Sequence, residues 1–257
     1  IYRHQIVRKV SYWKTLKKIY FLKDKTLNCN ITKQNFHSIS IFEEAKSFIP
    51  RRIYCVGANY KKHVLEMGLP GRENPFYFMK PSDAIVPVSS DEFVNLPYPS
   101  MTNDLHHEIE LVVVIGKEGN NIAFSDAQEY IFGVAVGLDM TRRDLQKKLR
   151  QKRQPWELAK AFDFSAPISQ VHNIKQISNI QDLDISLELN GVVKQNSNTS
   201  NMIFSVNEII SDLSQFFTLA PGDLLFTGTP EGVGPVNKGD KIVARVQNLC
   251  PLKVKII

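Results

Sequence analysis

Short apolar runs bounded by glycine and proline predict strands over most of the chain after residue 52. Residues 108–116 (EIELVVVIG) form the clearest of these runs. Residues 184–195 alternate between apolar and polar side chains around Asn190-Gly191, which indicates a hairpin closed by a type I′ turn. Further strands are predicted over 53–57, 75–80, 131–140 and 224–226, and two more within 241–257.

Helical patterns are fewer and are irregularly spaced between the strands. Residues 205–217 form an amphipathic pattern with Ser205 as its N-cap, and residues 141–153 are charged and helix-like. Residues 59–67 and 123–130 also have helical composition. Between the elements, prolines predict one long irregular stretch, marked by Pro81, Pro87, Pro97 and Pro99. This order favours a β-rich α+β fold over the regular βαβ alternation of a Rossmann sheet.

Charge is distributed unevenly along the 257 residues. Residues 1–52 hold 12 Lys and Arg against 3 acidic residues, whereas residues 53–257 hold 20 against 23. We therefore predict a basic N-terminal extension over 1–52 and one globular domain over 53–257. Because the body of the chain is mildly acidic, nucleic acid is not expected as a partner.

Residues 1–40 contain nine Lys or Arg and a single acid, Asp24. This composition is typical of organelle transit segments, but arginine is scarce, and a solvated extension has the same features. Mitochondrial and cytoplasmic locations both remain open. No apolar run reaches the ~18–20 residues of a membrane helix, so no membrane partner is expected. Cys29, Cys55 and Cys250 form no CxxC pair, which argues against a zinc site or disulfide framework and favours a reducing compartment.

Three carboxylates lie at the ends of two predicted strands. Glu108 and Glu110 are two residues apart, so their side chains face the same side of the strand. Such a pair repels itself unless a cation lies between the carboxylates, and Mg²⁺ prefers oxygen ligands of this kind. Asp139 closes a buried apolar run, where an unpaired acid is costly, and would complete a set of three ligands. A solvated strand face for the glutamates and an N-cap role for Asp139 are the alternatives.

His63 and Glu66 lie three residues apart in the predicted helix over 59–67 and so share one face. A carboxylate bonded to one imidazole nitrogen raises the basicity of the other, which is how a general base that deprotonates water is built. A surface pair is the alternative. The sequence GLPG follows this helix, so the segment has the features of a mobile lid.

Further candidates follow along the chain. Lys160 lies in the apolar context WELAKAF, so it either extends to solvent or enters a pocket to stabilise an oxyanion. Arg143 would hold a substrate carboxylate through two hydrogen bonds, or belong to a basic helix face. The loop over 227–234 (TGTPEGVG) suggests anion binding by backbone N–H groups, or only a tight turn; it is not a P-loop. Thr229 in this loop could offer its hydroxyl to a carboxylate.

Taken in order, seven segments closely resemble the fumarylacetoacetate hydrolase family, and within it the acylpyruvase and oxaloacetate decarboxylase type. The resemblance runs from about residue 54 to residue 247 and leaves residues 1–52 outside. The segments are VGANYKKHVLEMG (56–68), FYFMKPSDA (76–84), LHHEIELVVVIGK (105–117), GLDMTRRDLQ (137–146), PWELAKAFD (155–163), NTSNMIFS (198–205) and PGDLLFTGTPEGVGPV (221–236).

The resemblance implies a mixed β-sandwich roll, as in the C-terminal domain of that family, and a homodimer. It implies Mg²⁺ or Mn²⁺ bound by Glu108, Glu110 and Asp139, and Ca²⁺ could take the same place in a crystal. It assigns catalysis to His63 and Glu66, on a lid that orders over bound substrate, and to Lys160. It assigns substrate binding to four further residues, Lys80, Arg143, Gln146 and Thr229.

The implied function is Mg²⁺-dependent hydrolysis of acylpyruvates, or decarboxylation of oxaloacetate to pyruvate, through a metal-stabilised enolate. Hydrolysis needs His63 and Glu66 to activate water, whereas decarboxylation does not. The expected partner is a small keto acid. Two alternatives stay open: a keto–enol tautomerase or isomerase on the same scaffold, and a protein that binds the small molecule without catalysis.

Overall fold

The computed structural model describes residues 38–66, 68, 74–89 and 92–257. Most of the expected extension over 1–52 lies outside these residues, as does part of the expected lid, residues 67 and 69–73. None of the helices in the described part of the chain is long and apolar enough to cross a membrane.

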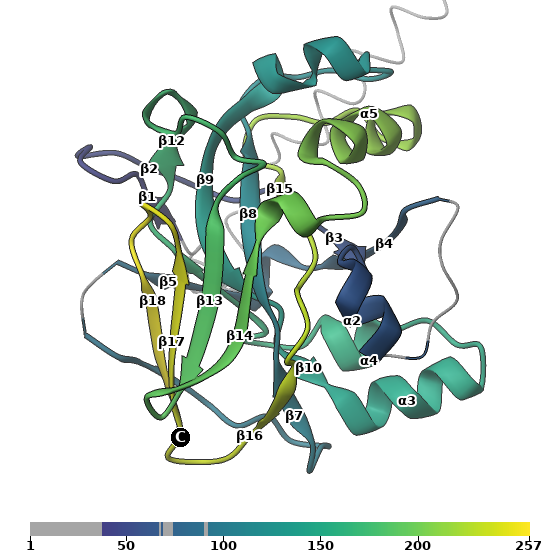
Figure 1. Cartoon of the computed structure of the whole chain (residues 1–257), viewed down its shortest axis with the longest axis vertical. Coiled ribbons are helices and arrows are strands. Elements are labelled where there is room, and N and C mark those ends of the chain that lie inside the picture. The colour runs from purple at the N-terminus through teal and green to yellow at the C-terminus, as the bar shows by residue number, and fades with distance from the viewer. Residues whose placement is uncertain (1–37, 67, 69–73, 90–91) are drawn as a thin grey trace, which may run out of the picture. The chain divides into compact units, whose positions relative to one another are not determined.

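A mixed β-sheet forms the centre of the fold (Figure 1). Within the described residues it has eight strands, seven of them in the order β4-β3-β15-β8-β9-β11-β5, with β12 paired to β9. The pairs β3–β15 and β5–β11 are parallel, and the others are antiparallel. The strands are β3 (Ile53–Gly57), β4 (Phe76–Lys80), β5 (Ile85–Val88), β8 (Ile109–Ile115), β9 (Ile131–Leu138), β11 (Ala166–Ser169), β12 (His172–Asn173) and β15 (Leu224–Phe226).

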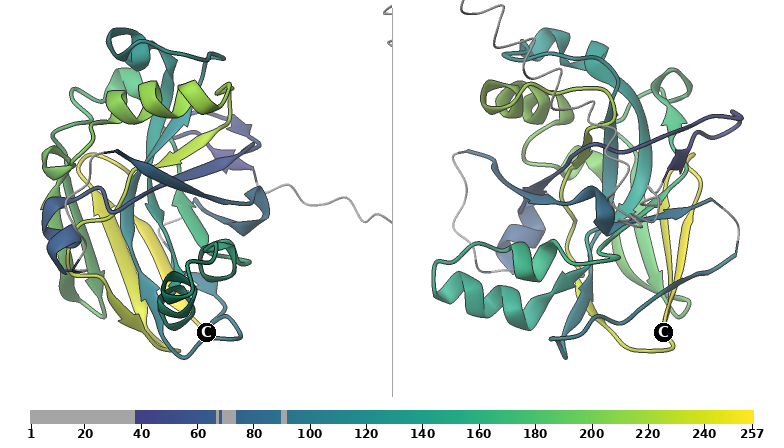
Figure 2. Two further views of the ribbon diagram at one scale, coloured as in Figure 1. Left: turned by 90° about the vertical axis from the view of Figure 1, so that its right-hand side faces the viewer. Right: turned by 180° about the vertical axis from the view of Figure 1, so that it is seen from behind.

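A second sheet packs against this one through contacts of β13 with β8, β17 with β9 and β18 with β11. Figure 2 shows the same arrangement from two further sides. Its strands are, in spatial order, β14 (Val192–Asn198), β13 (Asp184–Leu189), β17 (Lys241–Val246), β18 (Leu252–Ile256) and β6 (Val94–Leu96). Two smaller sheets pair β10 (Thr141–Arg142), β7 (Leu105–His107) and β16 (Gly234–Val236), and β1 (Ile39–Ser40) with β2 (Ser47–Phe48).

The helices lie around the sheets. Helices α2 (Lys61–Glu66), α3 (Arg143–Gln151) and α4 (Glu157–Lys160) gather on one side of the molecule, and α5 (Val206–Phe216) packs on η2 elsewhere (Figure 1). The 3₁₀ helices are η1 (Ser82–Ala84), η2 (Phe124–Tyr130), η3 (Ile174–Gln176) and η4 (Thr199–Asn201).

Strand β8 shows why the central strands are apolar almost without interruption. Leu111 and Val113 face the second sheet and belong to the core between the two sheets. Val112 and Val114 face the opposite side and belong to a smaller core with Phe226. Because successive side chains alternate between the faces, a sheet buried on both sides needs apolar residues at both parities.

The β-rich α+β class predicted from the sequence is confirmed, and so are most elements. Asn190 and Gly191 have φ of 53° and 80°, as a type I′ turn requires. The long irregular stretch predicted from the prolines is wrong, because it contains β5 and β6. Pro87 fits within β5 since this strand is at the edge of its sheet and needs no N–H on its open side.

The N-terminal cap of helix α5 can be tested by mutation. The Ser205 side chain accepts from the Glu208 N–H, and the Glu208 carboxylate accepts from the Ser205 N–H, which is a complete capping box. We expect Ser205→Ala to lower the free energy of unfolding by about 1 kcal/mol in chemical denaturation. Ser178→Ala, in an exposed bend, is the control. Equal stability of the two variants would contradict a capping role for Ser205.

Candidate active site

The register of two antiparallel strands brings three carboxylates together. Ile109 pairs with Leu138, and the next pair beyond the strand ends joins Glu108 to Asp139, whose N–H donates to the Glu108 carbonyl at 2.9 Å. Glu110 lies two residues after Glu108, on the same face. Glu108, Glu110 and Asp139 are buried, and each offers an oxygen within 4.8 Å of the others. The cluster expected from strand geometry is therefore present.

Two lysines contact this cluster. Lys160, at the end of α4, donates to Glu108 Oε2 at 2.8 Å and to Asp139 Oδ2 at 2.5 Å. It also donates to Thr141 Oγ1 at 2.6 Å. Lys80, at the end of β4, has its Nζ 2.8 Å from Asp139 Oδ1 and donates to the Lys160 carbonyl. Of the two alternatives for Lys160, solvent or pocket, the structure has the pocket: the residue is 2% exposed.

Arg143 supplies the third buried cation. Its guanidinium donates to Glu108 Oε1, and also to Gln146 Oε1 at 2.5 Å. Its Nε lies 3.4 Å from His106 Nδ1, and His106 Nε2 is 2.8 Å from Asp104 Oδ1. Arg143 is thus held on two sides and does not belong to a solvated helix face.

The three carboxylates differ in their electrostatic surroundings. Burial would raise the pKa of Glu108, but the charges of Lys160 and Arg143 outweigh it and hold this pKa below its ordinary value. Burial also raises the pKa of Glu110, and the negative charges of Asp139 and Glu108 add to this effect, so the pKa lies well above its ordinary value. The negative charge of Glu110 is therefore the least compensated of the three. The pKa of Lys160, which burial alone would lower, is raised by Asp139 and Glu108, so this lysine stays charged.

The glycine-rich loop contacts the protein's own carboxylates. The Gly228 N–H donates to Glu110 Oε2 at 2.7 Å, and the Gly232 N–H lies 3.3 Å from both oxygens of Glu66. Gly228 has a φ of +97°, and a Cβ there would lie 2.6 Å from the Asn59 Cβ. Only glycine fits this position without a shift of the backbone. The anion binding expected of these N–H groups is thus directed at Glu110 and Glu66.

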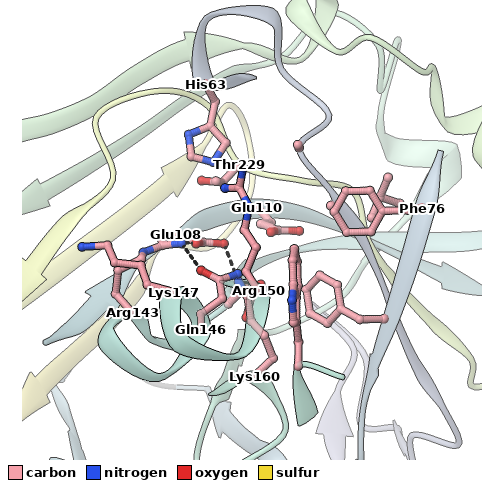
Figure 3. Close-up of a pocket in the computed structure, with 16 residues that line it drawn as sticks. His63, Phe76, Glu108, Glu110, Arg143, Gln146, Lys147, Arg150, Lys160 and Thr229 are labelled. Carbon is pink, nitrogen blue, oxygen red and sulfur yellow. Dashed lines mark hydrogen bonds and ion pairs between the residues drawn. The ribbon is translucent and has the colours of Figure 1, made fainter. Parts of the chain in front are cut away.

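His63 and Glu66 form the expected pair on α2. His63 Nδ1 lies 3.1 Å from Glu66 Oε2, and the imidazole is buried and lines the cavity described below (Figure 3). The side chain of Glu66 is 41% exposed. Because Nδ1 is engaged by the carboxylate, Nε2 is the nitrogen left to act as a base.

A single cavity of about 330 Å³ unites these groups (Figure 3). Eight of the ten site residues expected from the sequence line it: His63, Glu108, Glu110, Asp139, Arg143, Gln146, Lys160 and Thr229. The other two, Glu66 and Lys80, contact lining residues.

The cavity also has walls that the sequence analysis missed. Phe76 and Phe78 come from alternate positions of β4, and Trp156 lies four residues before Lys160. The rings of Phe76 and Trp156 meet edge to face, with centroids 5.4 Å apart. Lys147 and Arg150 line the cavity four and seven residues after Arg143, the spacing of one helix face. Strand and helix periodicity would have found all five.

The residues present fit a divalent metal ion. Asp139 Oδ1 is buried and has no hydrogen bond of good geometry to the described residues, although Lys80 is near. Glu110 has the Gly228 N–H but no basic side chain bonded to it within the described part of the chain. Three buried carboxylates are the oxygen donors that Mg²⁺ or Mn²⁺ prefers.

Buried carboxylates, a lysine and an arginine thus surround one cavity in a fold built on a mixed β-sheet. Residues 52–257 match the family model described as fumarylacetoacetate (FAA) hydrolase C-terminal, so this chain belongs to the FAA hydrolase family. The family and the fold expected from the sequence are both confirmed.

Several relatives are close. Oxaloacetate tautomerase FAHD1 of Bos taurus, whose name includes "mitochondrial", is 42% identical over 206 residues, covering 80% of this chain and 91% of that protein. A fumarylpyruvate hydrolase of a Ralstonia species is 41% identical, covering 72% of this chain and 93% of that protein. The crystal structure of fumarylpyruvate hydrolase from Pseudomonas aeruginosa with Mn²⁺ and pyruvate is 48% identical, with a TM-score of 0.84, covering 86% of this chain and 95% of that chain.

Metal binding gives the site a direct test. We expect Mn²⁺ or Mg²⁺ at about 100 times its Kd to stabilise the protein by about 2.7 kcal/mol, which raises the melting temperature by about 5–10 °C. Glu110→Gln keeps the shape of the side chain but removes the charge, so most of this shift should disappear. Glu129→Gln, at an exposed surface ion pair, should keep it. A full shift in Glu110→Gln would contradict Glu110 as a ligand.

Proposed function

We propose that this chain is a Mg²⁺- or Mn²⁺-dependent enzyme that hydrolyses acylpyruvates at the bond between the acyl carbon and C3 of pyruvate, and that decarboxylates oxaloacetate at the same site. One observation carries the proposal: a single cavity holds the carboxylate cluster, the buried Lys160 and the imidazole of His63 paired with Glu66. The names of relatives that act on oxaloacetate and fumarylpyruvate support it.

The roles follow from the contacts. Glu108, Glu110 and Asp139 would hold the metal ion, which when bound supplies Lewis-acid stabilisation of negative charge on the keto acid. Lys160 remains charged in a buried site, where it stabilises the charge that develops on the departing pyruvate. Four further side chains orient the substrate: Lys80, Arg143, Gln146 and Thr229.

In hydrolysis His63 acts as a general base. Its Nε2 takes a proton from water as the water oxygen bonds to the acyl carbon. The bond from that carbon to C3 of pyruvate then breaks, and its electron pair leaves with pyruvate as the enolate. Protonation at C3 gives pyruvate, and the acyl part leaves as a carboxylate. In decarboxylation of oxaloacetate, CO₂ departs, the same enolate forms, and no water is needed.

A keto–enol tautomerase is the second candidate, favoured by the oxaloacetate tautomerases among the relatives. In that reaction a proton moves between C3 and the C2 oxygen, and no carbon–carbon bond breaks. The groups that stabilise an enolate would serve both reactions. The two candidates differ in the need for a base that activates water, which is His63.

We also propose that residues 53–257 form the catalytic domain and that the enzyme is a homodimer, as the family resemblance implies. The FAHD1 relatives have "mitochondrial" in their names, which supports a mitochondrial location for this chain. The cytoplasm is the alternative.

Pyruvate release tests the proposal. With Mg²⁺ or Mn²⁺, the protein should release pyruvate from both acetylpyruvate and oxaloacetate, and EDTA or Glu110→Ala should abolish both activities. Unchanged pyruvate release in EDTA would rule out the metal assignment. No release from either substrate, together with rapid tautomerisation of oxaloacetate, would favour the second candidate.

His63→Ala separates water activation from enolate formation in the same assays. We expect it to slow acetylpyruvate hydrolysis about a hundredfold or more, and to slow tautomerisation and decarboxylation of oxaloacetate much less. Lys61→Ala, on the exposed side of α2, is the control. An equal loss in all the reactions would show that His63 is not specific to hydrolysis.

The outer part of the cavity favours acyl groups that end in a carboxylate. Lys147 and Arg150 continue the face of α3 that begins with Arg143, and Arg150 extends over the cavity (Figure 3). Lys147 has Asp104 at 3.7 Å, whereas Arg150 has no ion pair with any residue that the structure describes. Both charges thus belong to the cavity lining, and in the proposed function a carboxylate at the distal end of an acyl group would pair with them.

Charge reduction on this helix tests that preference. We expect Lys147→Gln and Arg150→Gln each to raise the KM for fumarylpyruvate about fivefold, the effect of losing ~1 kcal/mol of ion pairing, and to leave the KM for acetylpyruvate unchanged. Lys148→Gln removes the same charge from a neighbouring residue that does not line the cavity. Equal effects on both substrates would contradict recognition of a distal carboxylate.

A further inference from the structure

Gln195 is a buried amide that the proposed mechanism does not use. It lies on β14 and is the only fully buried residue of that strand. The register of β14 with β13 shifts just before it, so Lys194 is an extra residue in a β-bulge. Gly232 packs so closely on this bulge that a Cβ there would lie 2.0 Å from the Lys194 carbonyl. The bulge and the glycine together turn Gln195 toward the loop that contains Thr229.

The hydrogen bonds of Gln195 fix which way its amide faces. Its Oε1 accepts from the Ile109 N–H at 3.1 Å, and its Nε2 donates to the Pro230 carbonyl at 2.9 Å. A backbone N–H can only donate and a carbonyl can only accept, so the oxygen and nitrogen of the amide cannot be exchanged. His107 Nδ1, 3.0 Å from Oε1, must therefore carry its proton.

This orientation determines whether the Thr229 hydroxyl donates or accepts its hydrogen bonds. The second hydrogen of Gln195 Nε2 points at Thr229 Oγ1, at 2.8 Å. Thr229 thus accepts from an amide that has no acceptor to offer in return. Its own hydroxyl hydrogen has no acceptor among the described residues, and Thr229 lines the cavity. The hydroxyl is left to donate into the cavity, toward an anionic oxygen.

We propose that Gln195 is a positioning residue that holds Thr229 as a hydrogen-bond donor to the carboxylate of the keto acid. The inference rests on the proposed function, since it takes the ligand of the cavity to be a keto acid. The same amide bonds to both neighbours of Glu108, His107 and Ile109. Gln195 thereby joins the strand break that contains Glu108 to the loop that contains Thr229.

A double-mutant cycle on pyruvate binding tests the role. Gln195→Glu keeps the size of the side chain but puts an acceptor opposite Thr229, whose hydroxyl then turns away from the cavity. With Mn²⁺ present, we expect Gln195→Glu and Thr229→Val each to raise the Kd for pyruvate about ten- to a hundredfold, as for the loss of a hydrogen bond to a charged group. The Kd of the double variant should be no higher than that of the single variant with the higher Kd, because both changes remove the same donor.

Controls separate positioning from general damage. Asn196→Asp introduces the same charge at the next, exposed residue and should leave pyruvate binding unchanged. Thr229→Ser keeps the hydroxyl, so it should weaken pyruvate binding less than Thr229→Val does. If Gln195→Glu does not fold, as judged by its thermal transition, Gln195→Met replaces it in the cycle. Met lacks the donor, so its effect on the Kd should again vanish in the Thr229→Val background.

The outcomes are distinct. Two results would overturn the positioning role alone. One is a double variant whose increase in the Kd for pyruvate is the product of the two single increases. The other is a Gln195 variant that binds pyruvate as the unchanged protein does. Failure of the unchanged protein to bind pyruvate with Mn²⁺ would overturn the proposed function and this inference together.

Discussion

The central constraint on this structure is the burial of three carboxylates beside one another. Like charges within 4.8 Å repel strongly in a medium of low polarity, and the transfer of each from water costs several kcal/mol. The antiparallel register of β8 and β9 brings the three carboxylates together. It places Asp139 opposite Glu108, and Glu110 lies on the same face of the strand as Glu108. Everything else around the cavity must compensate this charge.

The compensation is unequal, and this inequality has a functional consequence. Lys160 and Arg143 both bond to Glu108, and Lys160 and Lys80 lie against Asp139. From the residues that the structure describes, Glu110 receives only a backbone N–H, that of Gly228. A divalent cation gains most where a carboxylate has no cation of its own, so in the proposed site metal binding should depend most on Glu110. The chain that leaves β9 supplies much of this set, since Arg143 and Lys160 both follow Asp139 within α3 and α4.

The parts of the site that could be predicted from the sequence are those governed by local periodicity. The spacing of Glu108 and Glu110 sets their common face, and the spacing of His63 and Glu66 sets their contact. The same rule applied to α3 would have found Lys147 and Arg150. Gln195 could not be found in this way, because its role depends on a bulge and on packing between separate sheets. Pro87 led to the wrong prediction of an irregular stretch, because a strand accepts proline only at the edge of a sheet and the sequence does not show which strands lie at an edge.

One loop connects the parts of the site that the chemistry requires to act together. The Gly228 N–H donates to Glu110, Thr229 lines the cavity, and the Gly232 N–H lies against Glu66, the partner of His63. Asn59, just before α2, is bound to the same loop through the Thr227 carbonyl at 2.8 Å. A shift of this loop would therefore move the metal ligand, the hydroxyl donor and the base at once. In the proposed function, enolate stabilisation uses the metal ligand and the hydroxyl donor, whereas hydrolysis also uses the base. Because Asn59 and Glu66 both bond to this loop, the base on α2 is held in place by the same segment that holds Glu110 and Thr229.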